Sequence, residues 1–177
     1  EFEWNQTIKL VLIYGIASGM EFLHSHGILH RNLCPESIFL NKYHKPLIGN
    51  FGLLTKIHSI KSMTYQSTVG IKGNPSYSSP ELIESGTYSE SSDVYAFAMI
   101  VYEIMTLNVP FKDIKNINGL YKEVVTLGRR PKIDNLGMPQ SYVSLIESCW
   151  SQNPNERPTF KEIVSSLEED VGFITPK

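Results

Sequence analysis

Near the start of the chain, apolar residues recur every three or four positions, which places them on one face of a helix. This spacing predicts an amphipathic helix from about Thr7 to His26, and Gly27 is the kind of residue that commonly ends a helix. The apolar positions of this face are Ile8, Leu12, Ile16, Met20 and Leu23.

Two short apolar runs follow, "SIFL" at 37–40 and "PLIG" at 46–49, with the polar stretch "NKYHK" between them. Short apolar runs on either side of polar turn residues are typical of a β-hairpin. From Asn50 to Glu81 the chain is rich in Ser, Thr and Gly and shows little periodicity. We therefore predict a long loop there, and long loops in compact domains are often functional.

Helical patterns return in the second half of the chain. Asp93 to Leu107 is apolar nearly all round, which predicts a helix buried in the core. Shorter helices fit Asn118 to Leu127 and Gln140 to Trp150. The last helix begins in "PTFKE", where Thr159 and Glu162 have the spacing of a capping box. The pattern predicts a mainly α fold of the α+β type, with one small β-hairpin and one long loop.

Composition narrows the class of protein. The 177 residues have the size of one ordinary domain. The net charge is −2 and the few lysines look scattered, so we expect no nucleic-acid partner. The longest apolar stretch, Val94 to Met105, is too short to cross a bilayer of about 30 Å. The first residues are acidic and polar, so we expect no signal peptide. Cys34 and Cys149 are far apart and fit no metal or disulfide framework, which favours a reducing, cytoplasmic location.

Five segments then follow one another in a specific order. "HRNLCPES" at 30–37, "NFG" at 50–52 and "SPE" at 79–81 resemble the H-R-D-L-x-x-x-N, D-F-G and A-P-E motifs of protein kinases. The segment at 91–111 resembles the central helix of the protein kinase family. The segment at 149–160 resembles a late segment of the tyrosine-kinase-like and tyrosine kinase groups. Essentially the whole chain resembles the C-terminal lobe of a protein kinase.

The resemblance implies one partial kinase domain over residues 1–177, with a catalytic-loop region at 30–37 and an activation segment at 50–81. No Gly-rich loop, strand lysine or partner-helix glutamate precedes the first helix. The resemblance therefore implies that the N-terminal lobe is absent from this chain, which would hold only the lower half of a nucleotide cleft.

Three positions of one catalytic network differ from the family pattern. Asn32 stands at the place of the aspartate that accepts the proton of the substrate hydroxyl, and an amide cannot accept a proton at neutral pH. Cys34 stands at the place of a lysine common in Ser/Thr kinases. Asn74, in "GNPSY", stands at the place of a threonine that in those kinases contacts both residues.

The places of the metal ligands differ as well. Ser37 stands where the family has a metal-binding asparagine, and Asn50 stands where it has the aspartate of D-F-G. Magnesium prefers charged carboxylate oxygens. ATP is implied as a cofactor by the resemblance, but we expect its binding to be weak or absent, and Mg²⁺ binding to be doubtful.

Other residues match the structural positions of the family. By resemblance, His30 and Phe51 stack in the regulatory spine, and Asp93 holds the backbone of the catalytic loop. Glu81 pairs with Arg157, and breaking such a buried pair costs about 3–5 kcal/mol. The residues that build the fold are therefore present, while those that transfer a phosphate are replaced. The framework set also includes Arg31, Pro35, Gly52 and Pro80.

Three functions are compatible with this division. The first is a pseudokinase, a catalytically impaired domain that acts as a signalling scaffold or allosteric module. Its expected partners are other signalling proteins. The chain could form a homodimer, or a heterodimer with an active kinase. The second is an active ATP-dependent Ser/Thr kinase once an N-terminal lobe is present. The third is a stand-alone helical interaction domain.

Arg31 has two readings of similar weight. It can bind a phosphate on the long loop, or it can be kept for packing alone. The hydroxyl residues available for phosphorylation in the loop are Ser59, Ser62, Thr64, Ser67 and Thr68.

Three further features have a simple reading and a more specific one. His24 and His26 could bind a metal, but their spacing separates the rings on a helix, which favours solvated side chains. Cys34 could be reactive, but an ordinary thiol is favoured. Arg129 and Arg130 could form a docking patch, but an exposed charged turn is the simpler reading.

Overall fold

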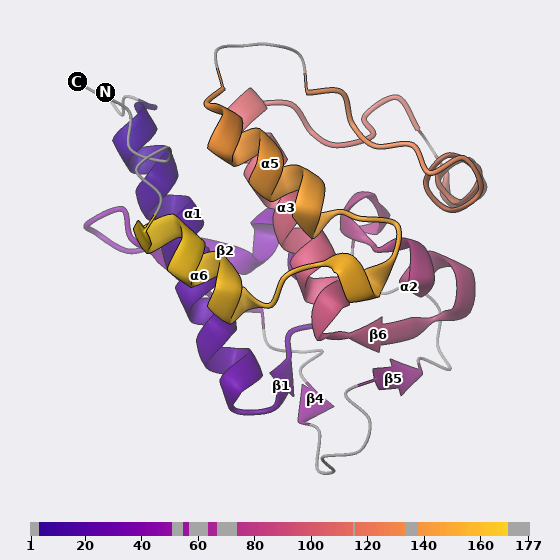
Figure 1. The fold of residues 1–177 in the computed structure, drawn as a ribbon, viewed down its shortest axis with the longest axis horizontal. Coiled ribbons are helices and arrows are strands. Elements are labelled where there is room, and N and C mark those ends of the chain that lie inside the picture. Colours follow the sequence, from indigo (N-terminus) through magenta and orange to yellow (C-terminus); the bar gives the residue numbers. More distant parts are fainter. Residues whose placement is uncertain are drawn as a thin grey trace.

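Helices form the body of the structure (Figure 1). The computed structural model describes residues 4–50, 55–56, 64–66, 74–114, 116–133 and 138–169. For 55–56 and 64–66 it describes the backbone only. The α-helices are α1 (Gln6–Ser25), α2 (Pro80–Ser85), α3 (Glu90–Thr106), α4 (Ile117–Leu120), α5 (Gln140–Cys149) and α6 (Phe160–Glu169). Short 3-10 turns occur at η1 (Pro35–Ser37), η3 (Pro75–Tyr77) and η5 (Pro154–Glu156), and a π-helical turn, η4 (Tyr121–Thr126), follows α4.

The described strands form three separate antiparallel pairs. They are β1 (Ile28–Leu29) with β4 (Thr55–Lys56), β2 (Ile38–Leu40) with β3 (Pro46–Ile48), and β5 (Thr64–Gln66) with β6 (Thr87–Ser89). The β2–β3 pair is the predicted hairpin, with Phe39 opposite Leu47. The prediction of a mainly helical fold with a small hairpin is confirmed.

Helix α1 matches the predicted amphipathic helix within one residue at each end. The Asn5 side chain caps it by accepting from the Ile8 N–H at 2.9 Å. Gly27, with φ of 67°, ends it. The helix packs against α6 on one side and against the hairpin strand β3 on another.

Two glycines allow the hairpin to lie directly on α1. A Cβ atom at Gly15 would stand 2.5 Å from Pro46 Cγ, and one at Gly19 would stand 2.7 Å from Ile48 Cδ1. Glycine inside a helix is unfavourable by about 0.5–1 kcal/mol relative to alanine. The close approach of β3, which carries the chain back towards the catalytic loop, explains why the helix has glycine at both places.

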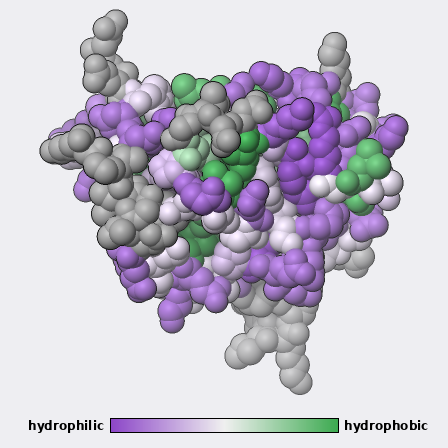
Figure 2. Space-filling view, turned by 45° about the horizontal axis from the view of Figure 1, so that its top comes forward, coloured by the Kyte–Doolittle hydropathy of each residue, from purple (hydrophilic) through white to green (hydrophobic). Residues whose placement is uncertain are grey.

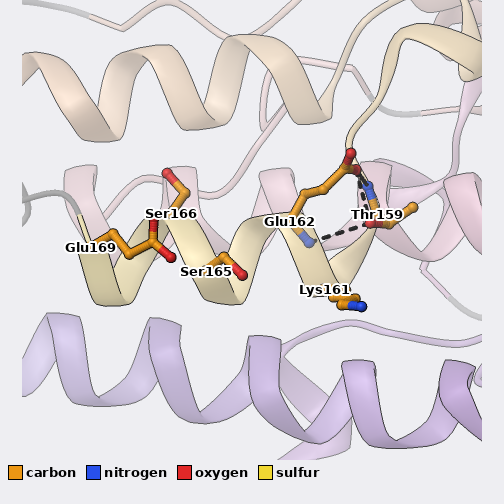
Figure 3. Close-up of a pocket in the computed structure, with 6 residues that line it drawn as sticks. All are labelled: Thr159, Lys161, Glu162, Ser165, Ser166 and Glu169. Atoms are coloured by element: carbon orange, nitrogen blue, oxygen red, sulfur yellow. Dashed lines mark hydrogen bonds between the residues drawn. The ribbon is translucent and has the colours of Figure 1, made fainter.

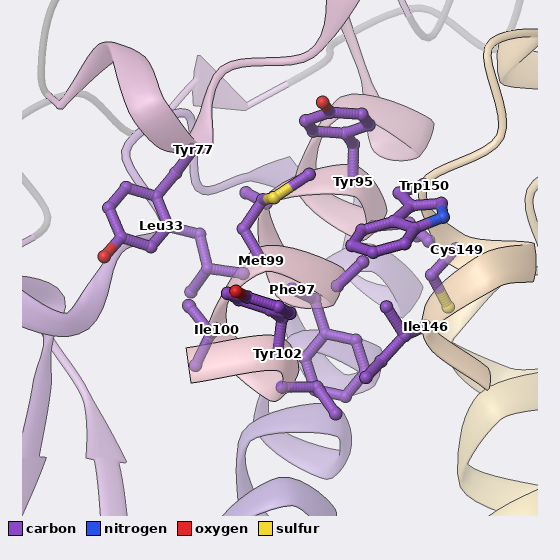
Figure 4. Close-up of a cluster of buried hydrophobic side chains, with 14 of the residues drawn as sticks. Leu33, Tyr77, Tyr95, Phe97, Met99, Ile100, Tyr102, Ile146, Cys149 and Trp150 are labelled. Atoms are coloured by element: carbon purple, nitrogen blue, oxygen red, sulfur yellow. The ribbon is translucent and has the colours of Figure 1, made fainter. Parts of the chain in front are cut away.

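Helix α3 runs through the core, as predicted (Figure 4). It begins three residues earlier than expected, because Ser89 and Ser92 form a capping box that the apolar pattern does not reveal. Its Phe97 ring packs edge-on against Phe160 of α6, with 5.3 Å between ring centres. The helix therefore connects the core to α6 as well as to α5.

The predicted capping box at the start of α6 is confirmed (Figure 3). The Glu162 N–H donates to Thr159 Oγ1 at 3.3 Å, and the Thr159 N–H donates to Glu162 Oε2 at 2.7 Å. The hollow drawn in Figure 3 lies along this helix and is lined by its polar side chains. None of them is a predicted site residue.

Two predictions of secondary structure need correction. The stretch from Asn50 to Glu81 is not loop throughout, since β4, β5, η3 and the start of α2 fall within it. Strands of two or three residues are too short to show alternation. The helix expected at 118–127 is divided into α4 and η4, and the Leu127 N–H donates to the Lys122 carbonyl at 3.0 Å in the π pattern.

Within the described ranges, no helix is both long enough and apolar enough to cross a membrane.

Candidate functional site

The catalytic-loop region begins where β1 ends. His30 is fully buried, and its Nδ1 accepts from the Asn32 N–H at 3.3 Å. Because Nδ1 accepts, the ring proton lies on Nε2, which donates to the Gly49 carbonyl at 3.0 Å. His30 therefore joins the loop to the end of β3, directly before Asn50.

A single buried carboxylate, that of Asp93 at the start of α3, holds this loop. Its Oδ2 accepts from the His30 N–H at 3.0 Å, and its Oδ1 accepts from the Arg31 N–H at 3.2 Å. The Tyr88 hydroxyl donates to Oδ1 at 2.5 Å. Burial acts to raise the pKa of Asp93, but the hydrogen bond and charge of His24 and the other donors outweigh it and lower the pKa overall.

The backbone of Arg31 adopts a left-handed conformation, with φ of 67°. Such a φ is uncommon for a residue other than glycine, and the surrounding structure must compensate for its cost. Asp93 compensates by accepting the N–H of Arg31 itself. The guanidinium of Arg31 lies 6.0 Å from the centre of the Tyr88 ring, in the range of a cation–π contact.

His24 also belongs to this site, so the prediction that it is solvated is wrong. Its side chain is 9% exposed, and its Nε2 lies 2.9 Å from Asp93 Oδ2. The ring packs edge-on against Phe160 at 5.1 Å. His26, by contrast, is exposed and stacks on Phe22. Among the described residues, no group of three or more His, Cys, Asp and Glu side chains is placed to hold a metal ion.

The structure brings Asn32, Cys34 and Asn74 together around one small cavity of about 20 Å³, which has room for about one water molecule. The Cys34 thiol donates to the Asn32 carbonyl at 3.5 Å. The Asn74 side chain caps η3 by accepting from the Ser76 N–H at 3.2 Å. Burial raises the pKa of Cys34, so the thiol form is favoured over the reactive thiolate.

The two positions predicted from the resemblance to correspond to metal ligands differ in exposure. Ser37 is fully buried, and its hydroxyl donates to the Asn32 carbonyl at 2.7 Å, which turns its proton into the loop. Asn50 is exposed and has a left-handed backbone with φ of 61°. The Gly49 N–H donates to the Ser37 carbonyl at 2.8 Å, so Asn50 leaves the hairpin directly beside the loop.

Glu81, at the start of α2, forms a two-pronged ion pair with Arg157. Their N–O distances are 2.8 and 2.9 Å, and the Ser92 hydroxyl donates to the same carboxylate. Burial acts to raise the pKa of Glu81, but the bonds and charge of Arg157 lower it overall. The Arg157 guanidinium also lies 5.1 Å from the centre of the buried Tyr95 ring.

With this geometry in place, comparison with known proteins identifies the family. The family model described as "protein tyrosine and serine/threonine kinase" matches residues 2–167 of the chain. The chain belongs to the protein kinase family. Its fold of helices with a small hairpin is that of a kinase C-terminal lobe.

Individual kinases resemble the chain over most of its length. It is 35% identical to the dual specificity protein kinase pyk3 of Dictyostelium discoideum, over 93% of this chain and 12% of that protein. A probable serine/threonine-protein kinase of the same organism is 35% identical over 89% of this chain and 17% of its own length. A protein kinase and PP2C-like domain-containing protein of Arabidopsis thaliana is 28% identical over 94% and 30%. The chain thus spans less than a third of these relatives.

Several predicted residues of this kinase lobe fall outside the described part of the chain. They are Phe51 and Gly52 of the NFG motif, and the loop residues Ser59, Ser62, Ser67 and Thr68. The backbone of Thr64 lies in β5, but its side chain is outside the description. The stacking of Phe51 on His30 and the phosphate-binding role of Arg31 stay predictions.

The charged turn of the kinase lobe needs a partial correction. Arg129 is exposed and pairs with Asp113 at 2.8 Å and with Glu123 at 3.4 Å, in line with the simpler reading. Arg130 is half-buried. It donates to the Trp150 carbonyl at 2.8 Å and lies 5.2 Å from the centre of the Tyr95 ring, so it is part of the fold.

Sequence reasoning missed three residues that shape this site: His24, Tyr77 and Tyr88. Tyr77 of η3 donates a short hydrogen bond to Glu103 of α3, and burial together with that carboxylate raises its pKa. No local pattern signals the two tyrosine contacts. The burial of His24 could have been inferred, because it follows the buried Met20 by one helical turn and so shares its face.

Proposed function

We propose that this chain is part of a kinase domain with impaired phosphotransfer, which serves as a binding or allosteric module in signalling. The observation that carries the proposal is the pair of amides, Asn32 and Asn50, at the places of the catalytic base and the main metal ligand. Loss of a general base alone lowers the rate by about 10²- to 10⁴-fold.

The surroundings of these residues support the same view. Cys34 offers a buried, neutral thiol where a fixed positive charge would assist phosphate transfer. The Ser37 hydroxyl donates its proton into the loop. Together, Ser37 and Asn50 would offer a metal ion only neutral oxygens, and such a set of ligands does not fit Mg²⁺ well. Nucleotide binding would then depend on contacts other than a carboxylate-held metal.

The framework supports a role as a module. Asp93 still holds the loop backbone, and Arg157 still pairs with Glu81. A lobe with these contacts presents a defined surface to other signalling proteins, including a second copy or an active kinase. We propose that it belongs to the tyrosine-kinase-like group and lies in the cytoplasm, in keeping with its segment at 149–160 and its two separated cysteines.

The alternative is an active kinase acting on Ser or Thr. It is favoured by the relatives described as probable serine/threonine or dual specificity kinases. In this reading, the hydroxyl oxygen of Ser37 and the amide oxygen of Asn50 would still reach a metal ion, with weaker attraction.

A phosphotransfer assay separates the two functions. The natural protein that carries this chain is compared with its Asn32→Asp plus Asn50→Asp variant, using labelled ATP, Mg²⁺ and a mixed Ser, Thr and Tyr peptide library. The impaired reading expects background transfer from the natural protein and an increase of about tenfold or more in the variant. Transfer by the natural protein at about 1–100 per second, the ordinary kinase range, would contradict it.

A thermal-shift measurement tests the cofactor separately. Weak metal binding predicts that ATP changes the melting temperature equally with and without Mg²⁺. A stabilisation by ATP that requires Mg²⁺ would show that the neutral ligands suffice.

A further inference from the structure

Positive charge is concentrated in one part of the chain, so the expectation of scattered lysines is wrong there. Residues 112–132 hold six Lys and Arg against two Asp and Glu, although the whole chain has a net charge of −2. The described cations of this segment are Lys112, Lys122, Arg129, Arg130 and Lys132.

A groove lies between the end of α3 and the chain that follows η4. Its volume is about 210 Å³. Tyr102 and Phe111, 7% and 5% exposed, belong to the core and form its apolar wall. Val109, which is 47% exposed, lies at its edge. The space has room for one or two apolar side chains, and we call it the basic groove because of its rim.

The rim carries Lys112, Arg129 and Lys132 together with one acidic residue, Asp113. Arg129 is partly neutralised by Asp113 and Glu123, while the Lys112 ammonium donates to the neutral side chain of Asn108 at 3.0 Å. Within the described part of the chain, neither lysine forms an ion pair. The rim therefore keeps positive charge for an incoming group. The space-filling view shows hydrophobic residues gathered near the middle of one face, with hydrophilic residues over most of its right side (Figure 2).

We propose that the basic groove docks an acidic segment of a partner protein, with one large apolar side chain seated against Tyr102 and Phe111. Carboxylates on both sides of that side chain would meet Lys112 and Lys132. Charge complementarity of this kind speeds association and selects partners. A concave groove with an apolar wall suits a peptide side chain better than the flat surface of a membrane.

This inference rests on the proposed function in that it gives the module a partner. It needs no nucleotide, so binding can be measured without ATP. A failure of binding would leave the phosphotransfer result untouched, and measurable phosphotransfer would not remove the groove.

The test uses fluorescence polarisation with the full chain. The probe is a labelled pool of Asp/Glu peptides that contain one central residue chosen from Leu, Phe, Tyr and Trp. We expect saturable binding that weakens as salt rises from about 50 to 300 mM. The Lys112→Glu plus Lys132→Glu variant should lose at least about tenfold in affinity, equivalent to about 1.4 kcal/mol.

The matched control is Lys42→Glu plus Lys45→Glu, an equal charge change on exposed residues of the hairpin turn. Its affinity for the peptides should stay within about twofold of that of the unmodified chain, because moderate salt screens the interaction between distant charges. Melting curves establish that both variants fold. A second variant, Val109→Asp, should also weaken binding, since it brings a carboxylate to the groove edge.

Several results would overturn the proposal. One is an absence of binding up to about 1 mM, which corresponds to about −4 kcal/mol. Another is an equal loss of affinity in the control variant. A third is equal binding of a peptide pool with Gly at the apolar position. Binding to phosphatidylserine-containing vesicles without binding to the peptides would assign the basic groove to membranes instead.

Discussion

The guanidinium of Arg157 donates to both carboxylate oxygens of Glu81, across 76 positions of sequence. The Arg157 side chain is fully buried and that of Glu81 is 17% exposed. The same guanidinium group donates to the carbonyls of Ser91 and Ser151 at 2.9 Å each. The pair therefore joins α2, the start of α3 and the segment before α6. Removing either side chain would leave the charge of the other buried without a partner.

Replacing Arg157 with Met should lower the free energy of unfolding by about 3–5 kcal/mol, because the Glu81 carboxylate would stay buried without its partner. Urea denaturation measures the change. The Glu81→Met plus Arg157→Met variant should be less destabilised than the sum of the single variants. Arg129→Met removes two exposed ion pairs, those with Asp113 and Glu123, and should cost about 1 kcal/mol or less. Equal losses at Arg157 and Arg129 would contradict the importance of the buried pair.

Stability should decline in acid. The ordinary pKa values of Glu and Asp are 4.5 and 3.8, and those of Glu81 and Asp93 are lowered in the folded chain. A lowered folded pKa gives stability that is fully present above the ordinary value and is lost as pH falls through the folded value. The melting temperature should therefore be level above about pH 5 and drop below about pH 4.5.

The Glu81→Gln variant tests the cause of this acid limb. It should melt lower than the unmodified chain near neutral pH, and its melting temperature should depend less on pH below about 4.5. An unchanged acid limb would mean that other carboxylates are responsible.

Two buried tyrosines should respond differently to loss of the hydroxyl. Tyr95 is fully buried, and among the described residues its hydroxyl has no hydrogen-bond partner. Tyr95→Phe should leave the free energy of unfolding within about 0.5 kcal/mol or raise it. Tyr88→Phe removes the donor to Asp93 and should lower it by about 1–3 kcal/mol. Chemical denaturation of both variants gives the comparison, and the reverse order would show that Tyr95 has a partner.

Gly15→Ala should destabilise the chain by about 1–3 kcal/mol, although alanine is favoured in helices by about 1 kcal/mol. The new Cβ atom would stand 2.5 Å from Pro46 and push the hairpin away from α1. Val11→Ala, at a half-exposed position of the same helix, is the control and should change the unfolding midpoint little. A rise in stability for Gly15→Ala would mean that the hairpin can move at no cost.

Local patterns predicted the elements that local interactions form. Helix α1, helix α5, the hairpin and the Thr159–Glu162 capping box were all found, because periodicity and capping act over a few residues. The pairs β1–β4 and β5–β6 were missed. Each has two or three residues, and their pairing depends on tertiary contacts between distant segments.

The site shows the same division. The motif order singled out Asn32, Cys34 and Asn74, and the structure places all three around one cavity. Their roles in a catalytic network stay a prediction. The surroundings of Asp93 were not found, because His24 lies 69 positions before it. The local sequence around a helical histidine does not indicate which distant carboxylate its side chain will contact.

Asp93 binds the catalytic loop by accepting hydrogen bonds from the main-chain N–H groups of residues 30 and 31, and not from side chains of the loop. The course of the loop is thus fixed independently of what stands at position 32. Substitution there can remove chemistry and leave the architecture whole, so one and the same loop can carry catalytic groups in one protein and only a shape for recognition in another.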